Sequence, residues 1–117
     1  FPIASNKMSP FNSQNIFIKG SLLKDYFLPP DVGRMDDIWA SYYVQAKGAR
    51  VVYGKASVYQ QRNVHDLTVD MKQEYIGYEH NLAIVKTLPD NPENILKYLP
   101  EQSVRARELY LRHFKGA

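Results

Sequence analysis

The chain of 117 residues contains no cysteine, so it can form neither a disulfide framework nor a thiolate metal site. It also lacks an apolar run of membrane-spanning length and a basic segment followed by an apolar one near its start. These absences predict no transmembrane segment and no signal peptide, and they favour a cytoplasmic location. Neither sign of charge dominates, because 15 basic residues stand against 12 acidic ones without a dense basic block. Nucleic-acid binding is therefore not expected.

What the chain does contain is enough apolar and aromatic residues, 44% and 13%, for one modest core. Helical spacing of apolar residues predicts a helix over 36–47, with Gly48 as its stop. A second stripe predicts a long helix over 66–87, with Asp66 as its N-cap. A helical tail follows, ending in a helix over 101–115. The stripe of the long helix is expected to pack inward and consists of Leu67, Met71, Tyr75, Tyr78, Leu82 and Val85.

Two other stretches predict short strands. Within residues 14–19, Ile16 and Ile18 alternate with Phe17 and Lys19, and residues 50–60 contain β-branched and aromatic runs around Gly54. We therefore expect an α/β or α+β fold in which a small mixed sheet packs with the helices. Residues 1–88 form the main portion, and 89–117 form a helical C-terminal extension packed on the same domain. Because so small a sheet is marginal alone, we expect more sheet in a larger domain, or a second copy in a homo-oligomer, to cover its edge.

Asp36 and Asp37 stand side by side where the first long helix is expected to begin. The first turn of a helix has unpaired N–H groups and a favourable dipole for negative charge. Asp36 as the N-cap and Asp37 as a first-turn acid would explain the pair without any catalytic role.

The run "GRMDDIWASYYVQAKGARVVYGKASVYQQRNVHD", preceded by "FNSQNIFIKGSLL", resembles the C-terminal part of the catalytic domain of GT-A-type nucleotide-sugar glycosyltransferases. Its amino-acid sequence most resembles the branch containing plant reversibly glycosylated polypeptides, and the resemblance covers roughly residues 10 to 66. The chain lacks the Asp-X-Asp motif of that family and the half that holds the nucleotide. The resemblance therefore implies a fragment or truncated form of an enzyme that transfers a sugar from a nucleotide-diphosphate donor to an acceptor hydroxyl. The isolated chain is expected to be inactive.

The resemblance also implies roles for particular residues. Asp37 corresponds to the acid that takes the proton from the acceptor hydroxyl in inverting enzymes, and Asp36 would hold acceptor hydroxyls. In a retaining enzyme both acids would only orient the substrate. His65 is the candidate ligand for Mn²⁺ or Mg²⁺ in the complete enzyme, and Arg62 would help to hold the diphosphate. No metal is expected in the isolated chain, since one ligand does not make a site.

Three further residues are candidates for contact with a sugar. The indole of Trp39, one turn from the acidic pair, is large enough to cover a sugar face, although core packing explains it as well. Asn12 and Gln14 offer amide groups to an acceptor, although a turn before the expected strand explains them equally. Two other functions stay open: a non-catalytic module that binds a glycan or protein, and a small α/β domain whose acids are structural.

Overall fold

The computed structural model describes residues 3–4 and 7–115 of the chain. Its elements follow in the order β1 (Ile3–Ala4), η1 (Gly20–Leu22), η2 (Gly33–Met35), α1 (Asp36–Ala46), β2 (Val52–Tyr53), α2 (Leu67–Thr87), η3 (Pro92–Tyr98) and α3 (Glu101–Lys115). The η elements are 3₁₀ helices.

The three long helices begin and end within one residue of the predicted bounds. Gly48 follows α1 with a φ of 106°, the left-handed conformation in which glycine is favoured. Asp66 caps α2, because its carboxylate accepts hydrogen bonds from the N–H groups of Thr68 at 2.9 Å and Val69 at 3.4 Å. Local spacing and capping signals therefore suffice to place these helices.

The predicted mixed sheet is wrong, since the described chain is predominantly helical and its strands form one small antiparallel pair. Ile3 lies opposite Tyr53 and Ala4 opposite Val52, and residues 14–19 form no strand. Alternating side chains of the extended segment, such as Ile16 and Ile18, pack against the α1 side of the core instead of joining a sheet. The expectation that a second copy covers a sheet edge stays a prediction.

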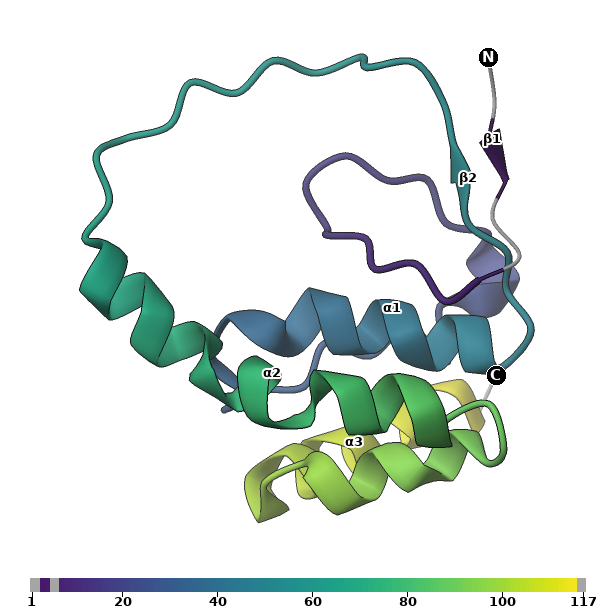
Figure 1. The fold of residues 1–117 in the computed structure, drawn as a ribbon. Coiled ribbons are helices and arrows are strands. Elements are labelled where there is room, and N and C mark those ends of the chain that lie inside the picture. Colours follow the sequence, from purple (N-terminus) through teal and green to yellow (C-terminus); the bar gives the residue numbers. More distant parts are fainter. Residues whose placement is uncertain (1–2, 5–6, 116–117) are drawn as a thin grey trace.

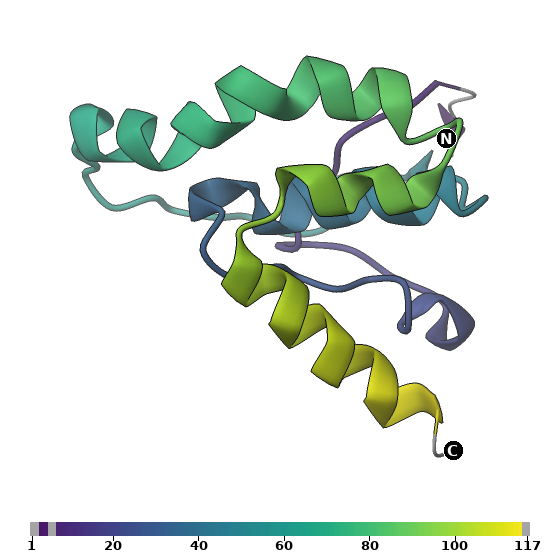
Figure 2. The same cartoon turned by 90° about the horizontal axis from the view of Figure 1, so that it is seen from below.

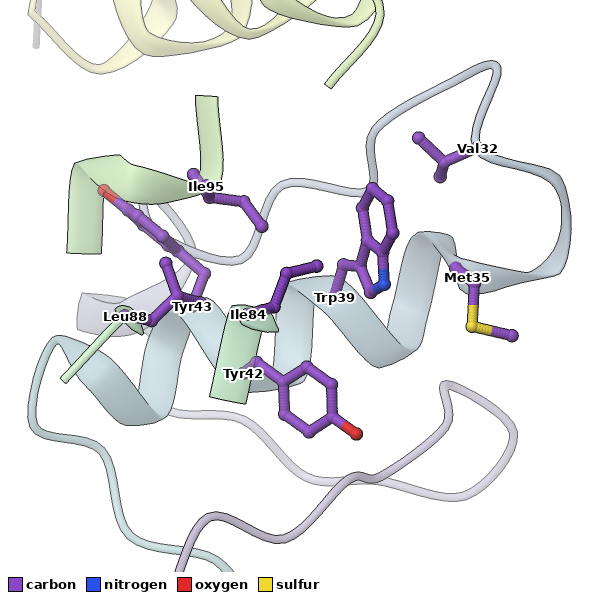
Figure 3. Close-up of a cluster of buried hydrophobic side chains, with 8 residues drawn as sticks. All are labelled: Val32, Met35, Trp39, Tyr42, Tyr43, Ile84, Leu88 and Ile95. Atoms are coloured by element: carbon purple, nitrogen blue, oxygen red, sulfur yellow. The ribbon is translucent and has the colours of Figure 1, made fainter. Parts of the chain in front are cut away.

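Helix α1 lies in the middle of the molecule, with α2, η3 and α3 on one side and the irregular N-terminal segment on the other (Figure 1). Residues 39–44 of α1 are all buried. The main core joins α1 to α2 and η3 (Figure 3) and consists of Val32, Met35, Trp39, Tyr42, Tyr43, Ile84, Leu88 and Ile95. Burial from two sides explains why this helix is so rich in aromatic residues.

The second side of α1 faces the chain that precedes it. Tyr26, Ala40 and Val44 form a smaller buried cluster there, with Phe11 and the extended segment 16–18 packed around it. The rings of Phe11 and Tyr26 stack with centroids 6.0 Å apart. This contact covers a helix surface that a sheet was expected to cover.

The last helix, α3, packs back on the segment that precedes α1. The Ser103 hydroxyl donates to the carbonyl of Pro30, and the Tyr110 hydroxyl donates to the carbonyl of Leu23. The Tyr110 ring also packs against Phe27, with centroids 5.2 Å apart. Among the described helices, none has both the length and the apolar character needed to cross a membrane.

The apolar stripe predicted to bury α2 is largely exposed, which corrects that expectation. Helix α2 contacts the core through another face, on which Gly77 and Ile84 are buried, and of the predicted stripe only Val85 packs partly against the core. The remaining members lie 60–74% exposed and are called the α2 stripe below: Leu67, Met71, Tyr75, Tyr78 and Leu82.

Candidate functional site

Asp37 lies in the first turn of α1 and is half-buried. Its Oδ2 accepts hydrogen bonds from the Ser13 N–H at 2.9 Å and from the Ser13 hydroxyl at 3.3 Å. The N-terminal segment thus fixes the carboxylate at the start of the helix. Within the described residues both bonds end on Oδ2, which leaves Oδ1 facing no protein donor.

One prediction made Asp36 the N-cap of α1. In the structure Asp36 is instead the first residue of the helix. Met35 occupies the N-cap position without a capping side chain. The Oδ1 of Asp36 accepts a hydrogen bond from the Asp37 N–H at 2.7 Å, so the carboxylate satisfies one free amide of the first turn from inside the helix. The two acids therefore bond to different partners.

Both carboxylates affect the pKa of one buried tyrosine, Tyr26. Burial above all, and then the charges of Asp37 and Asp36, raises the pKa of Tyr26. The Tyr26 side chain is 9% exposed, and within the described residues its hydroxyl has no hydrogen-bond partner. The hydroxyl therefore stays protonated beside the acidic pair.

An open groove of about 1070 Å³ lies along α1, where Ile38 and Val44 line it, between residues 10–22 and residues 48–57. Asn12 and Asn15 line it, and the side chain of Asn15 donates to the Ser57 hydroxyl at 3.0 Å. Asn12 and Asn15, which lie close in sequence to the Asp37 partner Ser13, line the groove, as does Ile38 of the first turn of α1, whereas Asp37 itself does not line it.

The charged residues that line the groove are all cations. Its lining includes Lys19, Arg50 and Lys55, all exposed, and no aspartate or glutamate. Sequence reasoning missed these three residues, because they are isolated cations in separate stretches and form no basic run. Their common feature is that each borders a stretch of extended chain, and only the fold brings those stretches together.

Two of the predicted sugar-contacting residues are placed by local contacts. The Asn12 Oδ1 accepts a hydrogen bond from the Gln14 N–H at 3.2 Å, which is the turn that one prediction described. Both side chains are exposed, but only Asn12 lines the groove.

The structure corrects the role proposed for Trp39. Its side chain is 1% exposed, and its Nε1–H donates to the Oδ1 of Asn81 on α2 at 2.7 Å. The ring lies in the main core (Figure 3), so its faces are covered by protein and not open to a sugar. Asn81 accepts the hydrogen bond of the buried indole N–H. No sequence signal singled out this polar residue.

Arg62 and His65 lie on the exposed segment that leads to α2. The His65 Nδ1 is 3.7 Å from Asp70 Oδ2, and Asp70 also pairs with Arg34 at 2.8 Å. Within the described residues, no hydrogen bond or ion pair joins Arg62 or His65 to Asp36 or Asp37. The structure therefore does not bring the two halves of the predicted site together.

The described residues do not fit a metal site of this chain's own. Across residues 3–4 and 7–115, no three histidine, aspartate or glutamate side chains come close enough together to hold an ion. His65 has one carboxylate neighbour, Asp70, which the Arg34 guanidinium already engages. An ion bound with residues of a larger enzyme stays a prediction.

Comparison with protein-family models, with curated proteins and with solved structures found no match to this chain.

Proposed function

We propose that this chain is the acceptor-side part of a glycosyltransferase, which transfers a sugar from a nucleotide-diphosphate donor to an acceptor hydroxyl. The observation that carries the proposal is the exposure and the hydrogen bonding of the Asp37 carboxylate. Its carboxylate is partly exposed and is anchored through one oxygen by Ser13, and Asn12 and Asn15, close to Ser13 in sequence, line an open groove. A general base must combine such anchoring with a free oxygen within reach of the proton it removes.

In the proposed reaction, Asp37 Oδ1 accepts the proton of the acceptor hydroxyl. The acceptor oxygen forms a bond to the anomeric carbon of the donor while the bond from that carbon to the diphosphate oxygen breaks. Asp36 keeps one oxygen on the Asp37 N–H and offers the other to a second acceptor hydroxyl. The proposal assigns the nucleotide, and the divalent metal that would neutralise the departing diphosphate, to the rest of a larger enzyme.

The groove further favours an acceptor that carries negative charge. Three cations and no acid line it, and Asn12 and Asn15 add amide groups that suit hydroxyls and acidic oxygens. Charges of one sign in a concave site raise the local concentration of a ligand of opposite sign. We therefore assign the groove to the acceptor.

The test replaces each acid in a protein that joins this chain to its nucleotide-binding half. Asp37→Asn keeps the size of the side chain and an oxygen for Ser13 but removes the base, so turnover should fall on the order of 10²- to 10⁴-fold. Asp36→Asn is the matched variant and should mainly raise KM for the acceptor. Thermal melts should hardly move in either case, because each asparagine retains an acceptor oxygen.

A second candidate function is a non-catalytic binding module, because Asp37 also ties the N-terminal segment to α1. Normal turnover in Asp37→Asn, together with an unchanged melt, would end the catalytic proposal.

The isolated chain should release no nucleoside diphosphate above background, since its described residues form no metal site.

A further inference from the structure

Helix α2 has two apolar faces, and the core uses only one of them. The α2 stripe runs along the other face, where its members follow one another at intervals of four, four, three and four residues. This spacing places all five side chains within one narrow arc of the helix. Helix α2 lies along one edge of the molecule, with α1 and η3 on one side of it (Figure 2).

The stripe is large for a surface that nothing covers. At 60–74% exposure, its five side chains present on the order of 600 Å² of largely apolar surface. The largest apolar patch of a typical monomer is about 300–600 Å² and is often functional. A specific interface buries about 800 Å² per partner, which the stripe approaches once the stems of flanking side chains are added.

The charges beside the stripe show which partner fits. Lys72 and Glu79 are exposed on the same flank of α2, seven residues apart. In an antiparallel pair of α2 helices with Tyr75 opposite Tyr78 of a second copy, Met71 lies opposite Leu82 of that copy. Lys72 then lies within about 3 Å along the helix axis from Glu79 of the second copy, and symmetry repeats the pair.

A parallel pair would not be complementary in this way. The positions that flank the stripe would bring Glu74 towards Glu79 of the second copy, and like charges at such positions oppose association. From Met71 to Leu82 the intervals of the stripe are four, three and four residues, the alternation that lets two helices interlock along a seam.

We propose that two copies of this chain form an antiparallel dimer through the α2 stripe. Each copy supplies the same face, as a two-fold interface requires. This proposal is independent of the glycosyltransferase proposal, because it uses none of the residues of the groove or the acidic pair.

The first experiment measures the mass of the chain by sedimentation over a range of concentrations. The wild type should dimerise reversibly, and Leu82→Glu should raise the dissociation constant by roughly tenfold to a hundredfold, because it puts a charge in the seam. Leu109→Glu is the matched control, since Leu109 is a 64% exposed leucine on α3, outside the stripe. Circular dichroism should show both variants folded, as both side chains are already exposed.

The second experiment tests the orientation by exchanging charges. Lys72→Glu and Glu79→Lys should each weaken the dimer, because each places like charges together, and the double variant should restore it. A wild type that is monomeric at every concentration, or an equal effect of Leu82→Glu and Leu109→Glu, would overturn the proposal. Failure of the double variant to restore a dimer weakened by both single changes would overturn the antiparallel arrangement, and binding of the stripe only to a different protein would overturn the second copy as its occupant.

Discussion

The Tyr43 hydroxyl links three helices through one small network. It donates to Glu93 Oε1 at 2.7 Å, and Arg107 donates both to this hydroxyl at 2.9 Å and to Glu93 at 3.1 Å. The guanidinium carbon of Arg107 also lies 5.3 Å from the centre of the Tyr43 ring. The contacts join α1, η3 and α3, and no local sequence pattern pairs Arg107 with Tyr43 or Glu93.

This network makes stability depend on pH in the alkaline range. Burial first, and then the hydrogen bond to Glu93, raises the pKa of Tyr43 from 10.0 to about 12, although the Arg107 charge acts in the opposite direction. Between pH 10 and 12 the unfolded chain loses this proton while the folded chain keeps it. The network's contribution to the free energy of unfolding is therefore complete below pH 10 and falls as the pH rises through 12.

Tyr43→Phe isolates the effect. Below pH 10 the wild type should be more stable than Tyr43→Phe in denaturant unfolding, because the variant leaves Arg107 and Glu93 without the hydroxyl. The difference should shrink from pH 10 to 12. A difference that stays constant across that range would show that the Tyr43 proton is not linked to folding. Other tyrosines with raised pKa values titrate in both proteins and cancel in the comparison.

At the scale of elements, the packing of α2 on η2 depends on two glycines. Gly33 has a φ of 62°, and a Cβ on it would collide with the backbone carbonyl of Gln73 in α2. A Cβ on Gly77 would collide with the Met35 side chain of η2. The two elements therefore approach each other nearly backbone to backbone.

Gly33→Ala should destabilise the fold by roughly 2–5 kcal/mol, because it combines a left-handed backbone with a clash against a carbonyl that cannot move freely. The measurement is the free energy of unfolding in denaturant. Gly20→Ala is the control, since a Cβ there meets nothing within 4 Å and its φ is not positive. Similar stability of the two variants would mean that the contact between η2 and α2 is looser than described.

The same elements show how far local sequence signals reach. The Asp66 cap and the Gly48 stop act within one turn, so the start of α2 and the end of α1 follow from neighbouring residues alone. Periodicity could not predict which face of α2 is buried, because apolar residues occupy two faces of the helix. The face that packs against the core is the one with Gly77. Alternation at residues 14–19 likewise fits any apolar surface beside an extended segment, and here that surface is a helix.

At the scale of the whole molecule, one core is assembled from two distant stretches of chain. Val32, Met35 and Trp39 come from the first stretch, and Ile84 and Ile95 come from the second. The sequence could predict that a single core exists but not this pairing, because no local pattern records which helices meet. The same limit applies to the candidate site, where the residues beside Asp37 were foreseen in part and the cations of the groove were not.

Between these stretches, residues 54–66 have no regular structure and are exposed throughout, and beyond Ser57, which accepts a hydrogen bond from Asn15, the segment arches away from the rest of the chain (Figure 1). A protease that recognises basic residues should therefore cut the native protein first after Lys55 or Arg62. The nicked protein should still elute as one particle in gel filtration, because the core that joins its two pieces lies elsewhere. Denaturant should separate the pieces, and mixing them after its removal should regain the helical circular dichroism. Fragments that part as soon as the loop is cut would show that covalent continuity, and not the shared core, holds the molecule together.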